Sequence, residues 1–247
     1  MHIVLPPSET KRDGGNSSPL DVADMSFPKL APVRRKLVNA LVSLARDESA
    51  SLRALKLGPK GAPEVQRNRL LKKSPTMPAI ERYTGVLYDA LDAHSLPSDD
   101  RARASERVLI HSALFGLIRA EDLIPAYRLS HDSRLPDISL KQAWSAKNAH
   151  VLQGMDGLLV DLRSEGYVEL GPVHARTNAV FLRVVTQSDG GHVRALNHFN
   201  KHAKGRFVRD LLSLETAPES VDELIAAAQT LGWKLDRGQE GEFNLWV

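Results

Sequence analysis

Cysteine is absent from this chain of 247 residues. That absence excludes disulfides, thiolate nucleophiles, thiol peroxidase chemistry and any site in which cysteine binds zinc or an iron–sulfur cluster. Any role in dealing with oxidants is therefore indirect. Aromatic residues make up only 5% of the chain, so a platform that stacks single-stranded bases would have few rings to use. If nucleic acid binds, contact with a duplex backbone is the favoured mode.

Long hydrophobic runs are also missing. No stretch approaches the roughly 18 apolar residues of a membrane helix. The opening Met1–Leu5 meets Pro6 and Pro7 instead of continuing into the apolar core of a signal peptide. We therefore expect a cytoplasmic protein without membrane contact. The signatures GxGxxG, Walker loop, HExxH and GxSxG are absent as well, and we predict no cofactor.

The residues that are present predict one globular unit. With 42% hydrophobic and 26% charged residues, the chain is long enough to bury one sizeable core. We expect a single domain over residues 1–247 and favour a monomer, although no sequence signal reports the oligomeric state. The net charge is +3 and the pI is about 9.2, which permits nucleic-acid binding without indicating it.

Hydrophobic periodicity predicts a mixed α/β fold, with a mixed central sheet surrounded by helices and without a regular βαβ repeat. Residues 12–32 are rich in Gly, Ser, Asp and Pro and are predicted to form an irregular loop that could act as a mobile flap. Strands are predicted at residues 3–5, 108–110, 157–160 and 179–185, at a short fifth strand after a Gly190-Gly191 turn, and at a closing pair, 233–235 with 243–247. Helices are predicted at residues 33–46, 51–57, 62–73, 83–91, 97–106, 140–153, 197–214 and 220–231.

The stretch that includes Arg67, Arg69, Lys72 and Lys73 is basic. We interpret it as a solvated helix face, because such faces are common. Pro75 is expected to help end this helical series.

Polar residues follow three of the predicted strands directly. They are Ser8–Lys11 after the first strand, Ser112 after the second and Asp161–Ser164 after the third. In open α/β sheets, ligands bind beyond the carboxyl ends of the strands, so the three groups are predicted to share one cleft. The alternative for each group alone is that a strand reaching solvent ends in polar residues by default.

The helix predicted from Asn197 carries polar residues on its core-facing side. Its apolar arc contains Phe207, Val208, Leu211, Leu212 and Leu214. Asn197, Asn200, Lys201 and Lys204 fall inside the same arc. Since burying an unpaired lysine is costly, these residues either extend outward to solvent or line a polar cleft that holds anions, and we favour the cleft. On the same helix, His198 and His202 have the i, i+4 spacing of a metal-binding pair, but no third ligand is recognisable, so no metal is predicted.

Four segments together resemble the bacterial peroxide-stress protein YaaA family, in its actinobacterial branch. They are Pro7–Lys11, Tyr83–Gly85, the run from Ser112 to Leu129 that contains Leu-Phe-Gly-Leu-Ile-Arg and Pro-Ala-Tyr-Arg-Leu, and the helix with Lys201, Lys204 and Gly205. The resemblance spans nearly the whole chain, and the third segment is the specific one.

The resemblance implies a fold unlike the common superfolds, a cytoplasmic location and survival of hydrogen peroxide by limiting free intracellular iron and oxidative DNA damage. It also implies binding of double-stranded DNA, without strong sequence specificity, through a positively charged cleft with a helix–hairpin–helix-like element. Family members often have glycine where this chain has Ala113. That departure weakens the assignment of the hairpin to Ser112–Gly116, since such a hairpin presents backbone N–H groups to phosphate.

Two main functions compete. The first is the DNA-binding stress protein, whose predicted phosphate contacts are Lys11, Arg119, Arg128, Lys201, Lys204, Arg206 and Arg209, beside cleft residues Asn197, Asn200, Thr84, Gly85 and Tyr127. The second is an enzyme acting on a nucleobase or nucleotide in the same cleft, with candidate catalytic groups Glu9, Asp161, Ser8, Thr10, Ser112 and Ser164 and a lysine as anion clamp. Direct iron sequestration is disfavoured, because the sequence shows no dense His/Asp/Glu cluster.

Overall fold

The protein is described by a computed structural model that covers residues 1–173, 178–187, 193–195, 199–239 and 241–247. Its fold is mixed α/β, as the sequence predicts, with a mixed sheet surrounded by helices. None of the helices in the described part of the chain is both long and apolar enough to cross a membrane.

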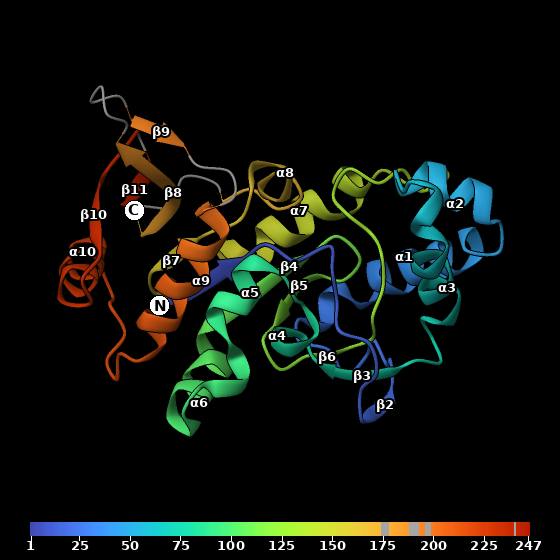
Figure 1. Cartoon of the computed structure of the whole chain (residues 1–247), viewed down its shortest axis with the longest axis horizontal. Coiled ribbons are helices and arrows are strands. Elements are labelled where there is room, and N and C mark those ends of the chain that lie inside the picture. Colours follow the sequence, from blue (N-terminus) through green and yellow to red (C-terminus); the bar gives the residue numbers. More distant parts are fainter. Residues whose placement is uncertain (174–177, 188–192, 196–198, 240) are drawn as a thin grey trace.

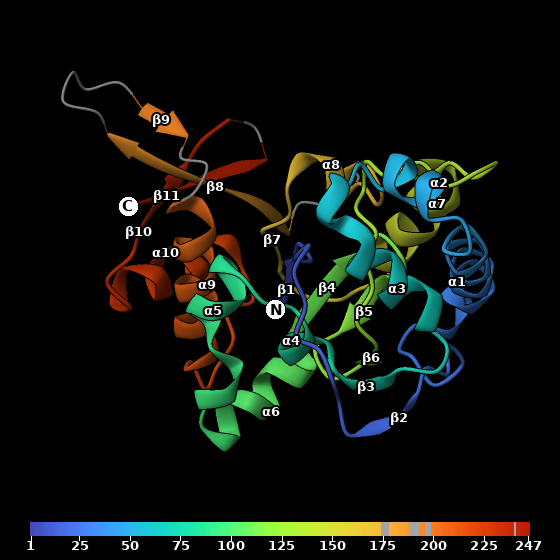
Figure 2. The same cartoon turned by 45° about the vertical axis from the view of Figure 1, so that its right-hand side comes forward.

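The main sheet has the strand order β10-β11-β8-β7-β1-β4-β5, and β9 pairs with β8 outside that path (Figures 1 and 2). Its strands are β1 (His2–Leu5), β4 (Val108–Ser112), β5 (Gly116–Arg119), β7 (Leu159–Asp161), β8 (Ala179–Gln187), β9 (Val193–Ala195), β10 (Lys234–Arg237) and β11 (Glu242–Trp246). The inner strands β4, β1, β7, β8 and β11 run parallel, while β5, β9 and β10 pair antiparallel with a neighbour. Strand β1 lies between the parallel strands β7 and β4, and residues 3–5 are fully buried, as expected for a parallel strand covered on both faces.

Helices cover the sheet and extend beyond one edge of it. They are α1 (Ala31–Leu44), α2 (Glu48–Ala54), α3 (Ala62–Leu70), α4 (Ala79–Arg82), α5 (Val86–Leu91), α6 (Ser98–Arg107), α7 (Leu140–Gln153), α8 (Glu165–Val168), α9 (Phe199–Leu212) and α10 (Val221–Thr230), with short 3-10 turns η1 (Pro28–Leu30), η2 (Pro59–Gly61) and η3 (Ala93–Ser95). Helix α9 packs on β8 and α5, and α6 packs on β1 and β4. Helices α1–α3 lie at one end of the molecule, and β8–β11 with α10 lie at the opposite end (Figure 1).

Helices α5 and α9 approach each other closely because Gly205 has no side chain. A Cβ added at Gly205 would lie 2.1 Å from the Leu87 carbonyl oxygen and 2.9 Å from the Ala90 Cβ, both on α5. We therefore expect Gly205→Ala to lower the free energy of unfolding by about 2–3 kcal/mol, since the two helices must separate. Urea denaturation measures this change.

Gly154→Ala is the matched control for that substitution. A Cβ at Gly154 would meet nothing closer than 3.5 Å, so its unfolding free energy should stay within about 0.5 kcal/mol of wild type. Equal stability of the two variants would contradict the close packing of α5 and α9.

The helical series ends before Pro75, as the sequence predicts, since α3 stops at Leu70. Pro75 then begins β3 (Pro75–Pro78), which joins β2 (Ser17–Pro19) and β6 (Leu123–Ile124) in a small second sheet that the sequence did not predict. The run after the second predicted strand is a buried β4–β5 hairpin rather than a polar turn, because the Ser112 Oγ accepts hydrogen bonds from the backbone N–H groups of Leu114 and Phe115. The Gly190-Gly191 turn, Asn197 and His198 lie outside the described residues.

The segment 12–32, expected to be an irregular flap, is tied to the rest of the fold by buried Arg82. The Arg82 guanidinium donates to the backbone carbonyls of Arg12, Gly14 and Ile124. The segment also contains β2 and η1. Those contacts fix its course against β3 and β6.

Candidate functional site

A pocket of about 760 Å³ opens at the carboxyl ends of β1 and β7. The chain leaves β1 toward β4 on one side and leaves β7 toward β8 on the other. Such a divergence of neighbouring parallel strands opens a crevice, and ligands of open α/β sheets bind there. The topology therefore marks this pocket as the candidate site.

The pocket brings together most of the cleft residues predicted from the sequence. Its walls come from the loop after β1, the turn before α5, the loop after β7 with α8, and the first turns of α9. The predicted residues that line it are Ser8, Glu9, Thr10, Thr84, Gly85, Ser164, Asn200, Lys201 and Lys204.

One wall of the pocket carries two hydroxyl groups. The Ser8 Oγ and Thr10 Oγ1 lie 3.2 Å apart, and Thr10 Oγ1 donates to the Thr84 carbonyl. Gly85 faces them with a φ of +94°, and a Cβ there would lie 3.2 Å from Thr10 Oγ1 and 3.3 Å from Ser8 Oγ. Glycine therefore suits this position for two reasons: it adopts the positive φ without strain, and it leaves space in front of the hydroxyls.

Another part of the wall is formed by α9. Lys204 is 7% exposed, its Nζ donates to the Leu162 carbonyl at 2.9 Å, and it lies 5.9 Å from the centre of the Phe181 ring. Burial lowers the pKa of the Lys204 ammonium from 10.5 to about 8, with Asp161 opposing the shift and Arg183 adding to it. Lys201, one turn earlier, is exposed and lines the same pocket.

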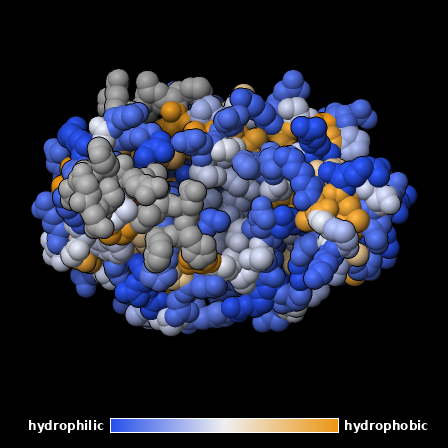
Figure 3. All heavy atoms as spheres, turned by 45° about the horizontal axis from the view of Figure 1, so that its top comes forward, coloured by the Kyte–Doolittle hydropathy of each residue, from blue (hydrophilic) through white to orange (hydrophobic). Residues whose placement is uncertain are grey.

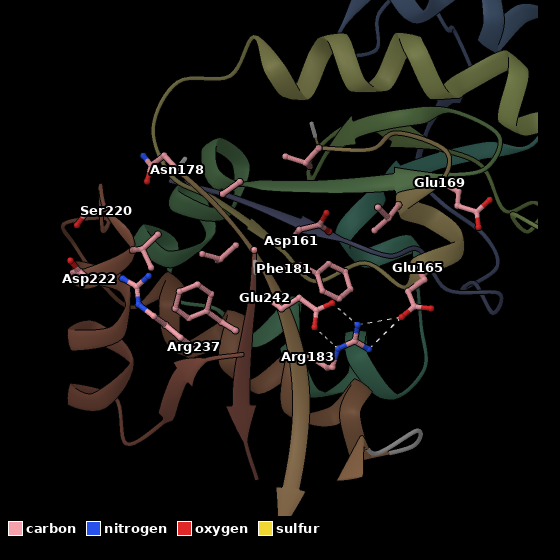
Figure 4. A pocket seen from close by; sticks show the side chains of 17 residues that line it. Asp161, Glu165, Glu169, Asn178, Phe181, Arg183, Ser220, Asp222, Arg237 and Glu242 are labelled. Carbon is pink, nitrogen blue, oxygen red and sulfur yellow. Dashed lines mark hydrogen bonds and ion pairs between the residues drawn. The ribbon is translucent and has the colours of Figure 1, made fainter. Parts of the chain in front are cut away.

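Phe181 and Arg183 on β8 separate this pocket from a second cavity of about 1040 Å³, which Asp161 and Glu242 also line. Figure 4 shows Arg183 extended between two carboxylates, Glu165 on α8 and Glu242 on β11. These ion pairs hold α8 against the far strands of the sheet, so the two cavities share a wall made of charged, partly exposed side chains.

A buried polar network supports the pocket from below. Arg163 is fully buried, and its guanidinium binds both oxygens of Asp161, at 2.9 and 2.6 Å. It also donates to His111 Nδ1 at 2.7 Å and to the Gly171 carbonyl. Burial and the neighbouring Arg163 hold the pKa of His111 well below its usual range, so the imidazole is neutral. The network joins the carboxyl ends of β4 and β7.

Three predicted residues lie beneath the pocket rather than in it. Lys11 is 6% exposed, with its Nζ bonded to the Ser8 and Glu9 carbonyls and 4.2 Å from the centre of the Tyr127 ring. Burial first, and then the neighbouring Arg128, lower the pKa of Lys11 to about 7, while Glu64 and Glu9 oppose the shift. The Tyr127 hydroxyl bonds the Ser112 Oγ at 2.7 Å inside the core. These three side chains brace the loop after β1.

The remaining predicted cations are dispersed over the molecule. Arg128 pairs with the Glu9 carboxylate at 2.7 Å, and Arg119 donates to the Glu106 carbonyl. Arg209 binds the Leu91 and Asp92 carbonyls, at the end of α5. Arg206 is exposed and lines a different cavity, shared with His202. The structure does not gather them into one groove.

Ser112–Gly116 does not form the hairpin suggested by the resemblance. The segment joins two strands and is fully buried from Ser112 to Phe115, so its N–H groups cannot reach a phosphate. Residues 55–61 instead join two packed helices, α2 and α3. Within the described residues, no group of three or more His, Asp or Glu side chains is placed to hold a metal ion.

Sequence reasoning missed the separation of charge along the chain. Residues 28–74 contain twelve lysines and arginines and three acidic residues, a net charge of +9. The whole chain carries +3, so the remaining residues sum to −6. Counting charge by segment would have found this asymmetry.

Fold and pocket together define a mixed α/β protein with a pocket at the switch point of its sheet. Comparison with known proteins identifies the family. The chain matches the family model described as peroxide stress protein YaaA over residues 1–239. It is 44% identical over 237 residues to a UPF0246 protein of Corynebacterium glutamicum, covering 94% of this chain and 93% of that protein. It is 40% identical over 245 residues to a UPF0246 protein of Streptomyces coelicolor, covering 96% and 92% of the two chains. The protein belongs to the peroxide stress protein YaaA family.

Proposed function

We propose that this member of the family binds double-stranded DNA through the phosphate backbone, using the helices α1–α3 as the contact surface. The observation that carries the proposal is the net charge of +9 on residues 28–74, against −6 on the rest of the chain. Lysine and arginine side chains that neutralise phosphates release counterions, and this supplies most of sequence-independent DNA affinity. We also propose that the protein is cytoplasmic and monomeric.

Most of these cations are exposed and have no ion-pair partner among the described residues. Helices α1–α3 lie together at one end of the molecule (Figures 1 and 2), and the surface of that end is largely hydrophilic with hydrophobic areas between (Figure 3). Arg67 pairs with Asp13 and Glu64, and Lys56 pairs with Asp132. The exposed cations without such a pair are Lys29, Arg35, Lys36, Arg46, Arg53, Lys60, Arg69, Lys72 and Lys73.

The connection between α2 and α3 supports the proposal that DNA contacts this surface. Residues 58–61 form a tight turn in which the Gly61 N–H donates to the Gly58 carbonyl at 2.9 Å. A Cβ at Gly61 would lie 2.6 Å from the Leu57 Cβ, so glycine is required for this packing. Gly58 and Lys60 are exposed, so the Lys60 side chain at this turn is available to a phosphate.

Fluorescence anisotropy of a labelled random-sequence duplex across about 50–200 mM salt tests the proposal. We expect Lys36→Gln/Lys72→Gln/Lys73→Gln to weaken binding at least about tenfold at low salt. The variant should also depend less on salt, because each lost phosphate contact reduces the slope of log K against log salt concentration by about 0.9.

The triple variant Lys141→Gln/Lys147→Gln/Lys234→Gln is the control, since it removes the same charge from other parts of the molecule. It should bind nearly as well as wild type. A loss of affinity confined to Lys201→Ala/Lys204→Ala would instead place the DNA on the pocket side of α9, and no binding by folded wild type at 50 mM salt would discard the proposal.

We also propose that the protein limits free intracellular iron and oxidative DNA damage during peroxide stress. The family description supports the stress role. Cells in which the DNA-contact triple variant replaces wild type should accumulate more DNA lesions under hydrogen peroxide. Chelatable iron, measured in the same cells, shows whether the effect on iron depends on DNA binding.

A further inference from the structure

The pocket beside β1 and β7 contains a buried lysine that forms no ion pair with any carboxylate of the described residues. Lys204 is 7% exposed, and within the described residues its Nζ has one hydrogen-bond acceptor, the Leu162 carbonyl. The nearby Asp161 carboxylate is held by both arms of Arg163. A buried ammonium without a counter-ion is unfavourable unless an anion binds beside it. Lys201 adds a second positive charge to the same wall.

An acceptor group in the same wall also lacks a partner. The Asn200 Oδ1 atom is buried and has no hydrogen-bond partner among the described residues. Asn200 lies one turn before Lys204 on α9 and lines the pocket. A buried carbonyl oxygen of this kind requires a donor, and a ligand hydroxyl or N–H group would supply one.

The rest of the lining fits a small organic molecule rather than a bare ion. The Ser8 and Thr10 hydroxyls also line the pocket, and Val86, Leu162 and Phe181 add apolar surface to the lining. The volume of about 760 Å³ is within the range of sites that bury a ligand of nucleotide size.

We propose that this pocket binds a phosphomonoester of sugar-phosphate or nucleotide size, with its phosphate at Lys201 and Lys204 and a hydroxyl or N–H group at the Asn200 Oδ1. No residue of α1–α3 lines this pocket, so the pocket and the basic surface can be tested by separate substitutions. The phosphomonoester comes either from a free metabolite or from the phosphorylated end of a broken DNA strand, because both present the same dianion beside a sugar.

Isothermal titration calorimetry on the full chain tests the proposal with ribose 5-phosphate, AMP, adenosine, inorganic phosphate and a short single strand with or without a 5′-phosphate. We expect AMP or ribose 5-phosphate to bind at least tenfold more tightly than adenosine or inorganic phosphate. Lys204→Met, which keeps the apolar stem, should weaken that binding at least tenfold. Arg206→Met on the exposed side of the same helix should leave it unchanged.

The phosphorylated strand identifies the source of the ligand. Tighter binding of that strand than of AMP, lost in Lys204→Met, assigns the site to DNA ends, whereas tighter binding of AMP or ribose 5-phosphate assigns it to a free metabolite. If Lys204→Met does not fold, Lys201→Gln carries the test, since Lys201 is exposed.

Three results would overturn the proposal: equal affinity for the esters and their phosphate-free analogues, affinity unchanged in the lysine variants, or no binding of any ester to folded wild type. Duplex affinity should survive in Lys204→Met, and ester affinity should survive in the Lys36/Lys72/Lys73 triple variant. Failure of the DNA proposal is thereby distinguishable from failure of this one.

Discussion

Replacing Asp161 with asparagine is expected to lower the free energy of unfolding by about 3–5 kcal/mol, the usual cost of breaking a buried ion pair by removing one partner. Water cannot replace the lost partner, because both side chains are buried: the Arg163 side chain is 0% accessible and the Asp161 side chain is 5% accessible. Asparagine would keep one acceptor and point an N–H group at the guanidinium. Urea denaturation followed by circular dichroism measures the loss.

The surface pair Lys141–Glu169 provides the control for Asp161. Its two atoms lie 2.9 Å apart, a similar separation, but the side chains are 64% and 62% exposed. Glu169→Gln should change stability by less than about 1 kcal/mol, because solvent screens an exposed pair. Asp161→Asn combined with Arg163→Met should cost less than the sum of the two single changes. Near-wild-type stability of Asp161→Asn would show that the network does not support the carboxyl ends of β4 and β7.

Arg34→Met is expected to have the second large effect, a loss of about 3–5 kcal/mol. The fully buried guanidinium of Arg34 donates to the backbone carbonyls of Phe115, Ser26 and Leu117, at 2.8, 2.7 and 2.7 Å. Each buried carbonyl left without a donor costs about 1–3 kcal/mol. Because these carbonyls belong to the β4–β5 hairpin and to the loop before α1, the substitution should also loosen the attachment of α1 to the sheet.

Arg35→Met is the matched control, since Arg35 is the next residue on α1 and is exposed. Its unfolding free energy should stay within about 0.5 kcal/mol of wild type. Hydrogen exchange of the backbone amides in β5 adds a second measurement, in which Arg34→Met should accelerate exchange and Arg35→Met should not. Equal stability of the two variants would show that water replaces the guanidinium without cost.

The lysines of the pocket and those of the α1–α3 surface differ in burial. Lys204 is held in one position by burial and by the Leu162 carbonyl, which suits selection of a small ligand. Lys36 and Lys72 are exposed, which suits an interaction that depends on charge and tolerates any sequence. The proposed division of function follows from this difference in burial.

The hydrophobic pattern of the sequence was sufficient to predict those helices and strands whose structure depends on their own residues. The buried run 3–5 reads directly as an inner strand, and helix α7 begins where Ser139 caps it and ends at Gly154. The inward position of Lys204 on α9 was also readable, because the helical period places it beside Phe207, Val208 and Leu211. The connection between β4 and β5 at Ser112–Gly116 was wrongly predicted to be a polar turn. Its hydrogen bonds are made by the buried Ser112, and a short polar residue after a strand looks the same in sequence whether it faces solvent or the core.

By itself, therefore, the sequence determined the α/β class, the family and the charge of residues 28–74, since each depends on residue types and their spacing. Only the tertiary structure decided which charges are available. Arg34, Arg82 and Arg163 are buried and bonded to backbone carbonyls or to Asp161, whereas the similar residues Arg35 and Lys201 are exposed. The reason is that burial and hydrogen-bond partners come from segments distant in the chain, so neither can be read from the neighbours of a residue in sequence.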